Sequence, residues 1–477
     1  MINYQDYDAT GLAALIREGA VTSGEVLDAA LLQVEKVNDK LNAVVLIQED
    51  EARRVIDAGL PDGPLRGVPF LLKDLYTAAV GFPSHNGSNL LRDTTYLQNS
   101  ELVNRFNAAG LVTFGRTTSP EAGVGIATEA VVYGGPTRSP WNTDHTAGGS
   151  SGGAAAAVSA GIVPAAHGSD GGGSVRIPAS SCGLVGFKPT RARLPIGPFI
   201  GEGWAGMAIA GFLTRSLRDT ALLLDLTEGP DLGAPYVAPP LKNSFVAALE
   251  IPPAPLRIAY CDTTLTGEAI HPDCVAAVKH TASLLADMGH HIIPARPDAD
   301  TNGMMFAWTD IVACGTALGI ETTIKLRGRA REDGEVELLA RSAMQHAKTV
   351  SGADYLAAVA KVHSYGRELA RFFQDYDLLL TPTLGEPPAR VGRFSHDTDD
   401  YVGFRTGPEG VFAYSPFAAA FNASGQPAVS LPLYWNTAGL PIGTHLAARY
   451  GEDELLMSVA ADLERAQPWF NRRPGVC

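Results

Sequence analysis

Residues 147–190 decide the fold of this chain, and they read AGGSSGGAAAAVSAGIVPAAHGSDGGGSVRIPASSCGLVGFKPT. Two glycine clusters in this stretch each run into a serine, Ser150 in the first case and Ser174 in the second. Glycine adopts positive φ angles and lets the backbone approach other groups closely. The pattern therefore predicts two sharp turns that each present a hydroxyl group. The glycine triplet at 171–173 can also aim consecutive N–H groups at one point, which suits a developing negative charge.

A stretch rich in glycine and serine can also be a flexible linker. Here the apolar segments 154–158 (AAAAV) and 162–166 (IVPAA) interrupt it, and Asp170, Arg176 and Lys188 occur singly. Apolar segments of this kind form helices or core strands. The mixed composition favours a folded segment over a linker.

The composition is that of a globular enzyme. Hydrophobic residues make up 45% and charged residues 18% of the 477 residues, which does not fit a disordered protein. The net charge of −14, with no block rich in lysine and arginine, argues against a nucleic-acid partner. The five cysteines are odd in number and form no CxxC pair, so we expect neither a disulfide framework nor a zinc site.

The sequence predicts a cytoplasmic protein with no membrane contact. The N-terminus, MINYQDYDATGLAALIREG, lacks the basic and then apolar pattern of a signal peptide. No uninterrupted apolar run is long enough to cross a bilayer. The cysteine usage agrees with a reducing compartment.

Helical and strand patterns alternate along the chain. Within residues 8–60, Thr10 is positioned to cap a first helix, and Thr22 with Glu25 has the spacing of a capping box for a second. The segment 230–255 is rich in proline and glycine and is a candidate boundary, and 385–410 reads as a long polar loop. Further helices are expected over 99–109, 154–160, 217–226, 273–288, 306–326, 460–469 and most of 335–373, and strands over 65–75, 111–114, 161–166, 257–261, 291–294 and 377–382.

The strand at 65–75, LRGVPFLLKDL, carries Lys73 near its end. Lysine is almost never fully buried unless it is paired. From the residues alone, a surface lysine is the expected reading.

Taken together, these motifs resemble the signature of the amidase signature family, serine hydrolases that cleave amides. The matching positions are Gly148–Gly153, the run from Gly168 to Ala179, and the later Cys182-Gly183 and Lys188-Pro189-Thr190. One departure is Gly171, where the family usually has threonine or serine, so the loop loses one stiffening hydrogen bond. A second is Arg116, in place of the usual lysine of a GKT-type segment. The resemblance is strongest over 65–225 and 377–465, and closest to 6-aminohexanoate cyclic dimer hydrolases and related amidases.

The resemblance implies an α/β fold with a large central mixed β-sheet covered by helices on both faces. It implies one amidase domain over 1–477. Within it we expect an N-terminal helical part (1–60), a signature core (61–228), a variable insertion that shapes the substrate pocket (229–375) and a closing part (376–477). Segments 421–432 and 441–448 resemble the closing strands of the family.

The resemblance also assigns the catalytic residues. Ser174 is the nucleophile, Ser150 relays its proton after a cis peptide bond, and Lys73 is the base. Lys73 must be neutral to accept a proton, so we expect burial to lower its pKa strongly.

The backbone N–H groups of Gly171, Gly172 and Gly173 are expected to form the oxyanion hole. Asp170 and Arg176 are expected to form a structural pair, and Ser151 to support Ser150. The chemistry requires no metal and no cofactor.

Residues 123–125 border the expected substrate pocket, together with Ser151. Val124 replaces a polar amide side chain of the nylon-oligomer branch, which implies a more apolar wall. The expected substrates are aryl or alkyl amides, anilides and cyclic or oligomeric amides, with carbamates and esters as further candidates. The expected partner is this small molecule alone, and a homodimer is one option for the assembly.

Four alternatives remain. The run from Gly148 to Gly152 satisfies G-x-S-x-G, which would make Ser150 the nucleophile of an α/β-hydrolase. His167 with Ser174 and Asp170 suggests a Ser–His–Asp triad, although the three lie awkwardly on one strand and turn. The same fold serves a glutaminase subunit that supplies ammonia to a partner enzyme. An inactive binding module is the last alternative, and the intact Lys73, with both serines, opposes it.

Overall fold

The computed structural model describes residues 3–477, and a single eleven-stranded sheet runs through it. The strand order is β1-β3-β2-β6-β8-β7-β12-β13-β11-β9-β10. The sheet is mixed, because β2 is parallel to β3 and β6 while β6 is antiparallel to β8. The strands are β1 (Val44–Val45), β2 (Pro69–Lys73), β3 (Val112–Thr117), β6 (Ala165–Asp170), β7 (Val185–Lys188), β8 (Ile209–Thr214), β9 (Arg257–Tyr260), β10 (His291–Pro294), β11 (Leu378–Pro382), β12 (Ala428–Trp435) and β13 (Pro441–Ala448). A separate hairpin pairs β4 (Arg138–Ser139) with β5 (Asn142–Thr146).

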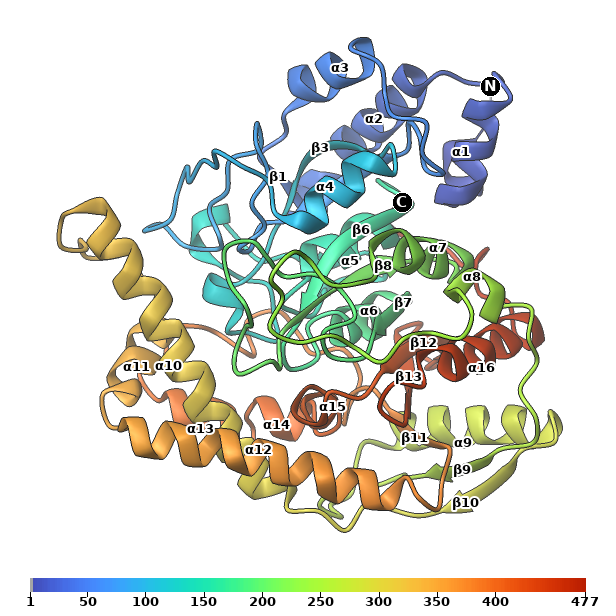
Figure 1. Ribbon diagram of the computed structural model, residues 1–477, viewed down its shortest axis with the longest axis vertical. Coiled ribbons are helices and arrows are strands. Elements are labelled where there is room, and N and C mark those ends of the chain that lie inside the picture. Colours follow the sequence, from blue (N-terminus) through green and yellow to red (C-terminus); the bar gives the residue numbers. More distant parts are fainter. Residues whose placement is uncertain (1–2) are drawn as a thin grey trace.

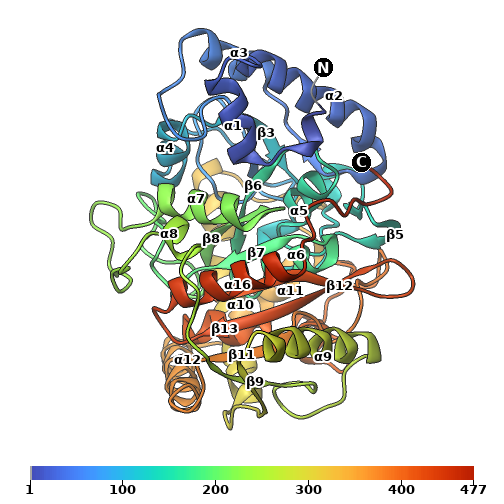
Figure 2. The ribbon, with the colours of Figure 1, turned by 90° about the vertical axis from the view of Figure 1, so that its right-hand side faces the viewer.

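Helices cover both faces of this sheet, as expected. Figure 1 shows α1–α3 at one end of the molecule and α10–α13 at the other, and Figure 2 shows α7, α16 and α9 in front of the sheet with α10 behind it. The helices are α1 (Ala9–Arg17), α2 (Ser23–Leu41), α3 (Glu49–Asp57), α4 (Glu101–Ala108), α5 (Gly152–Ser159), α6 (Arg176–Cys182), α7 (Leu217–Thr227), α8 (Phe245–Ala248), α9 (Pro272–Asp287), α10 (Thr301–Arg327), α11 (Leu338–Ala347), α12 (Gly352–Phe372), α13 (Tyr401–Thr406), α14 (Val411–Tyr414), α15 (Ala418–Ser424) and α16 (Asp453–Ala466).

Strands such as β2, β7 and β11 are buried along their whole length, which explains their continuous apolar sequences. In β11, Leu378 and Leu380 join the core beneath α9 and α16, whereas Leu379 joins the core beneath α10 and α12. Alternate residues of a strand point to opposite faces, so one run of leucines serves two cores.

Several expected elements have different ends. Asp8, rather than Thr10, caps α1 by accepting from the Gly11 N–H, and Thr10 donates to Asp219. The capping box of Thr22 and Glu25 is confirmed at the start of α2. The strand expected at 161–166 begins only at Ala165.

Two segments near the C-terminus also differ from expectation. The segment expected as a strand from residue 421 begins inside α15, because AAAFNAS favours a helix until Gly425, in left-handed conformation, ends it. The expected polar loop at 385–410 contains the short helix α13, whose start is capped by Asp400.

The helix α10 bears on the expectation about membranes, although Asp310 interrupts its apolar stretch. This helix is long and apolar enough to span a bilayer, with a mean hydropathy of 1.4 over its most apolar window. However, 56% of that window is buried inside the fold, where α10 packs against α11, α12 and α15. Its composition is accounted for by the core that it forms with residues such as Trp308 and Ile311.

Candidate active site

Lys73 is the last residue of β2 and is fully buried. Its Nζ lies 2.7 Å from Ser150 Oγ and 2.9 Å from Ser169 Oγ, so both partners are neutral hydroxyls. Burial lowers the pKa of Lys73 to about 7, and the charge of Asp170 only partly opposes this. The expected lowering of the pKa is confirmed, and the reading as a surface lysine is wrong.

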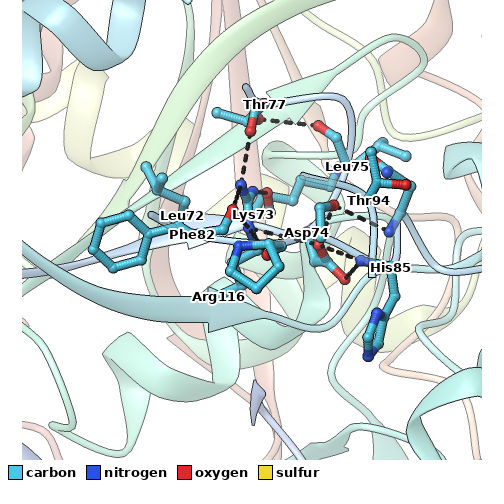
Figure 3. Close-up of polar contacts among 12 residues, drawn as sticks. Leu72, Lys73, Asp74, Leu75, Thr77, Phe82, His85, Thr94 and Arg116 are labelled. Carbon is cyan, nitrogen blue, oxygen red and sulfur yellow. Dashed lines mark hydrogen bonds and ion pairs between the residues drawn. The ribbon is translucent and has the colours of Figure 1, made fainter. Parts of the chain in front are cut away.

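The backbone around Lys73 is held by a buried pair, Asp74 and Arg116 (Figure 3). Arg116 donates to the carbonyl of Phe82 at 2.7 Å and to that of Lys73 at 3.4 Å. Asp74 accepts from the backbone N–H of His85 at 3.0 Å. These contacts satisfy both buried charges and fix the end of β2, so the lysine side chain starts from a rigid base.

Ser150 lies in the turn that leads into α5, and the peptide bond from Gly149 to Ser150 is cis. Gly148 has a φ of +78°, and a methyl group there would lie 2.9 Å from the Pro178 backbone. A methyl group on Gly149 would lie 2.8 Å from the Ile126 backbone. The two glycines are therefore required by close packing of the loop.

Ser174 follows β6 and the glycine triplet, just before α6. Its backbone carbonyl accepts from the N–H of Ser151 at 3.1 Å, which holds the two serine loops together. Ser150 and Ser174 line the same cavity. Within residues 3–477 no hydrogen bond joins their two hydroxyl groups, so the proton relay stays a prediction. Catalytic hydrogen bonds often tighten only when the substrate binds.

The oxyanion hole requires a correction at Gly173. Its N–H donates to Asp170 Oδ1 at 2.7 Å and is therefore already used. The other oxygen of Asp170 accepts from Val175 N at 3.1 Å. Gly171 and Gly172 stay candidates for the oxyanion hole, with the N–H of Ser174 beside them.

The expected pair of Asp170 and Arg176 is confirmed, with Arg176 Nη2 donating at 2.9 Å. Although burial opposes it, the Arg176 charge, with a hydrogen bond from Asn422, keeps the pKa of Asp170 below its usual range. Asp170 is thus a fixed anion that shapes the nucleophile turn.

The departure at Gly171 has a structural reason. A methyl group there would lie 2.5 Å from the Trp204 ring, so this tryptophan fills the space of a side chain. The Gly171 carbonyl also accepts from Trp308 Nε1 at 3.1 Å. The loop was expected to be less stiff because Gly171 has no side chain. Trp204 and Trp308 support it instead.

Ser169 is a site residue that sequence reasoning missed. It follows Gly168 in the signature and lies on β6, which is the neighbour of β2 in the sheet. The expected support of Ser150 by a hydrogen bond from the Ser151 side chain is not seen. Instead, Ser151 Oγ donates to the Ser169 carbonyl and accepts from the Ser169 N–H, both at 3.2 Å. The pairing of β2 with β6 was the signal needed to find Ser169.

His167 does not form a triad with Ser174. Its Nδ1 accepts from the Lys73 N–H at 3.4 Å. Burial, with the charges of Lys73 and Arg116, lowers the pKa of His167 to about 3. Asp170, the third member of that triad, is bound to Arg176 instead.

Two cavities meet at Ser174. The larger has a volume of about 190 Å³, and Leu75, Ile196 and Trp204 contribute to its largely apolar wall. The smaller has a volume of only about 10 Å³ and shares Gly123, Ser174 and Trp204 with the larger.

The expected pocket residues are only partly on these walls. Gly123 lines both cavities and Gly125 lines the smaller one. Val124 and Ser151 are buried and line neither. Val124 packs in the core with residues such as Met207, so the apolar wall has other sources than this valine. In the described part of the chain, no group of three His, Cys, Asp or Glu side chains is arranged to hold a metal.

Comparison with known proteins gives the family. The amidase family model matches residues 25–457. The 6-aminohexanoate-cyclic-dimer hydrolase of Paenarthrobacter ureafaciens is 37% identical over 98% of this chain and 96% of that protein. A solved structure of 6-aminohexanoate cyclic dimer hydrolase with substrate has a TM-score of 0.94 at 35% identity, covering both chains completely. A bacterial aryl acylamidase structure has a TM-score of 0.87 at 28% identity, covering 97% of this chain and 96% of that one.

The alternatives are judged by the same matches. A glutamyl-tRNA(Gln) amidotransferase subunit of Thermotoga maritima, at 24% identity and a TM-score of 0.78, shares the fold alone. The near-complete matches to amide hydrolases oppose the α/β-hydrolase and the inactive module. This chain belongs to the amidase signature family and is an amide hydrolase.

Proposed function

We propose that this enzyme hydrolyses amides through an acyl-enzyme on Ser174, with Ser150 as proton relay and Lys73 as base. One observation carries the proposal: the fully buried Lys73 lies 2.7 Å from Ser150 Oγ, and Ser150 shares a cavity wall with Ser174. A serine hydroxyl needs a base to become a nucleophile, and a lysine with a pKa of about 7 is substantially neutral at neutral pH.

In the first half of the reaction, Ser174 Oγ attacks the amide carbon and its proton passes to Ser150. The Ser150 proton passes to Lys73, which becomes an ammonium. The N–H groups of Gly171, Gly172 and Ser174 are the donors proposed for the oxyanion. The ammonium returns its proton through Ser150 to the leaving amine as the carbon–nitrogen bond breaks. Water then repeats the sequence on the ester and releases the acid.

The proposed substrates are aryl or alkyl amides, anilides and cyclic or oligomeric amides. The apolar wall of the larger cavity supports this, because such walls favour apolar substituents. The relatives named for a cyclic dimer of 6-aminohexanoate and for aryl acylamides support it too. Carbamates and esters are further candidates, since an alkoxide leaves more readily than an amine.

The partner proposed for this chain is the substrate alone, with no nucleic acid or membrane. A cytoplasmic location is proposed on the grounds that all five cysteines are unpaired, as is usual in a reducing compartment. The proposed assembly is a homodimer, and analytical ultracentrifugation would test this.

The test is hydrolysis of a 4-nitroanilide together with labelling by a fluorophosphonate. Wild type should be labelled at Ser174, and Ser174→Ala, Ser150→Ala and Lys73→Ala should each lose at least 100-fold in kcat/KM. Ser159→Ala is the matched control, since Ser159 is buried on α5 and donates only to the Cys182 carbonyl. A label on Ser150, or a Lys73→Ala variant of unchanged rate, would overturn the assignment of roles.

A further inference from the structure

The smaller cavity contains a buried arginine that the hydrolytic machinery does not use. Arg405, on α13, lines this cavity together with Ser174, and only 3% of its surface is exposed. Across residues 3–477, its Nε and Nη2 have no hydrogen-bond partner. No carboxylate of the described chain is among the groups that act on the pKa of Arg405. A buried charge without a counterion is costly, so a free guanidinium at a cavity wall indicates a missing anionic partner.

Two aromatic rings hold Arg405 in place. Its guanidinium carbon lies 4.8 Å from the centre of the Trp308 ring and 5.5 Å from that of Tyr401. Such contacts stabilise the cation, while its Nε and Nη2 have no hydrogen-bond partner in the described chain. Trp308 also donates to the Gly171 carbonyl, so the same ring fixes Arg405 relative to the nucleophile loop.

A second free donor lies on the same wall. Ser415 Oγ is buried, lines the smaller cavity and has no hydrogen-bond partner in the described chain. The planar guanidinium matches the two oxygens of a carboxylate, and a hydroxyl beside it can donate to the same group. The nearby wall is otherwise apolar, with Ile177, Val411 and Phe412.

We propose that the smaller cavity is a subsite for a carboxylate carried by the substrate, bound by Arg405 with Ser415. The substrates are then amides with a free carboxylate remote from the scissile bond, such as half-amides of dicarboxylic acids. The inference rests on the proposed hydrolysis at Ser174, because Ser174 is where the two cavities meet. One part of the substrate lies in the larger apolar cavity. The part with the carboxylate reaches Arg405 when the side chains around the smaller cavity, whose volume is only about 10 Å³, move apart on binding.

The experiment compares matched substrates that differ only in charge. One series consists of 4-nitroanilides of glutaric, adipic and suberic acid, each paired with an acyl chain of equal length that ends in a methyl group. A second pair, N-acetyl-4-aminobenzoate and 4-methylacetanilide, places the carboxylate on the amine side. The enzymes are wild type, Arg405→Met, Arg405→Lys and Ser415→Ala.

The matched control is Arg193→Gln. Arg193 is also 3% exposed, but it is paired with Asp453 at 3.2 Å and lines neither cavity. It reports the general effect of removing a buried arginine.

For at least one pair, Arg405→Met should lower kcat/KM for the carboxylate substrate at least tenfold and that of its neutral partner less than threefold. Arg405→Lys keeps the positive charge but loses the paired N–H donors of the guanidinium group. This variant and Ser415→Ala should show smaller selective losses. Arg193→Gln should affect both substrates of a pair equally. Equal losses on charged and neutral substrates in every pair would overturn the subsite and leave hydrolysis at Ser174 standing.

Binding to Ser174→Ala separates the two proposals. Calorimetry with adipic acid mono-4-nitroanilide should show at least tenfold weaker binding when Arg405→Met is added, and no change when Arg193→Gln is added. Selective binding without turnover by wild type would refute the proposed hydrolysis and keep the carboxylate site. If Arg405→Met does not fold, the same comparison with Arg405→Lys decides, and equal binding would refute the site.

Discussion

Two strand ends in this enzyme carry buried lysines of similar pKa and different surroundings. Lys73 ends β2 and Lys188 ends β7, and both are buried. Burial lowers the pKa of each to about 7. Lys73, however, faces the hydroxyls of Ser150 and Ser169, whereas Lys188 Nζ donates to the Pro189 carbonyl at 3.0 Å.

The comparison teaches that a lowered pKa reports burial and does not by itself identify a base. A carbonyl has no proton to give, so Lys188 cannot act on its partner. A hydroxyl beside a neutral amine can give its proton, so only Lys73 is placed for base chemistry.

The largest expected effect separates the two lysines directly. Lys73→Met should lower kcat/KM for a 4-nitroanilide by about 1,000-fold, because general bases contribute about 100- to 10,000-fold. Lys188→Met should lower it less than tenfold. The measurement is steady-state kinetics with the active fraction set by fluorophosphonate titration, and similar losses in both variants would break the comparison.

The pH profile should follow Lys73. Its neutral form is the active one, so kcat/KM should fall about tenfold per pH unit as the pH drops below about 7. Lys188→Met should keep this profile, although its lysine has a similar pKa. If Lys188→Met shifts the midpoint of the profile, the titration belongs to Lys188 and the prediction for Lys73 is wrong.

Ser169→Ala tests the second hydroxyl at Lys73. The Ser169 side chain lies 2.9 Å from Nζ and positions it toward Ser150. We expect about a fivefold loss in kcat, with Ser174 still labelled, since one positioning hydrogen bond is typically worth about 1 kcal/mol. The midpoint of the pH profile should also shift, which a merely structural serine would not cause.

Lys188→Met should have the smallest effect on activity but a clear effect on how stability depends on pH. Between about pH 7 and 10 the unfolded chain holds a proton on Lys188 that the folded chain has lost, so the free energy of unfolding rises with pH in this window. Lys188→Met removes this contribution and should lower the slope by up to about 1.4 kcal/mol per pH unit. Urea unfolding at pH 7.5 and 9.5 measures it, and an unchanged slope would contradict the assigned burial of the charge.

The sequence was sufficient for much of the site because the family signature lies in short local motifs. The two glycine–serine turns, the pair of Asp170 and Arg176 and the capping box of Thr22 each depend on neighbours a few residues away. Local conformation follows from local residues, and glycine in particular restricts which turns can form. The expectation that Phe421 begins a strand was wrong because AAAFNAS favours a helix up to Gly425, and α15 also packs against α10 and α12.

By itself, the sequence determined the mixed α/β architecture through its resemblance, and it led to the roles proposed for Lys73, Ser150 and Ser174. Tertiary structure alone decided that Ser169 contacts Lys73, that the Gly173 N–H is taken by Asp170, and that Arg405 shares a cavity with Ser174. The physical reason is that β2 and β6 become neighbours only through sheet pairing, and α13 reaches the cavity from more than 200 positions further along the chain. A residue's type sets what it can donate or accept, but the packing of distant segments sets whether a partner is there to receive it.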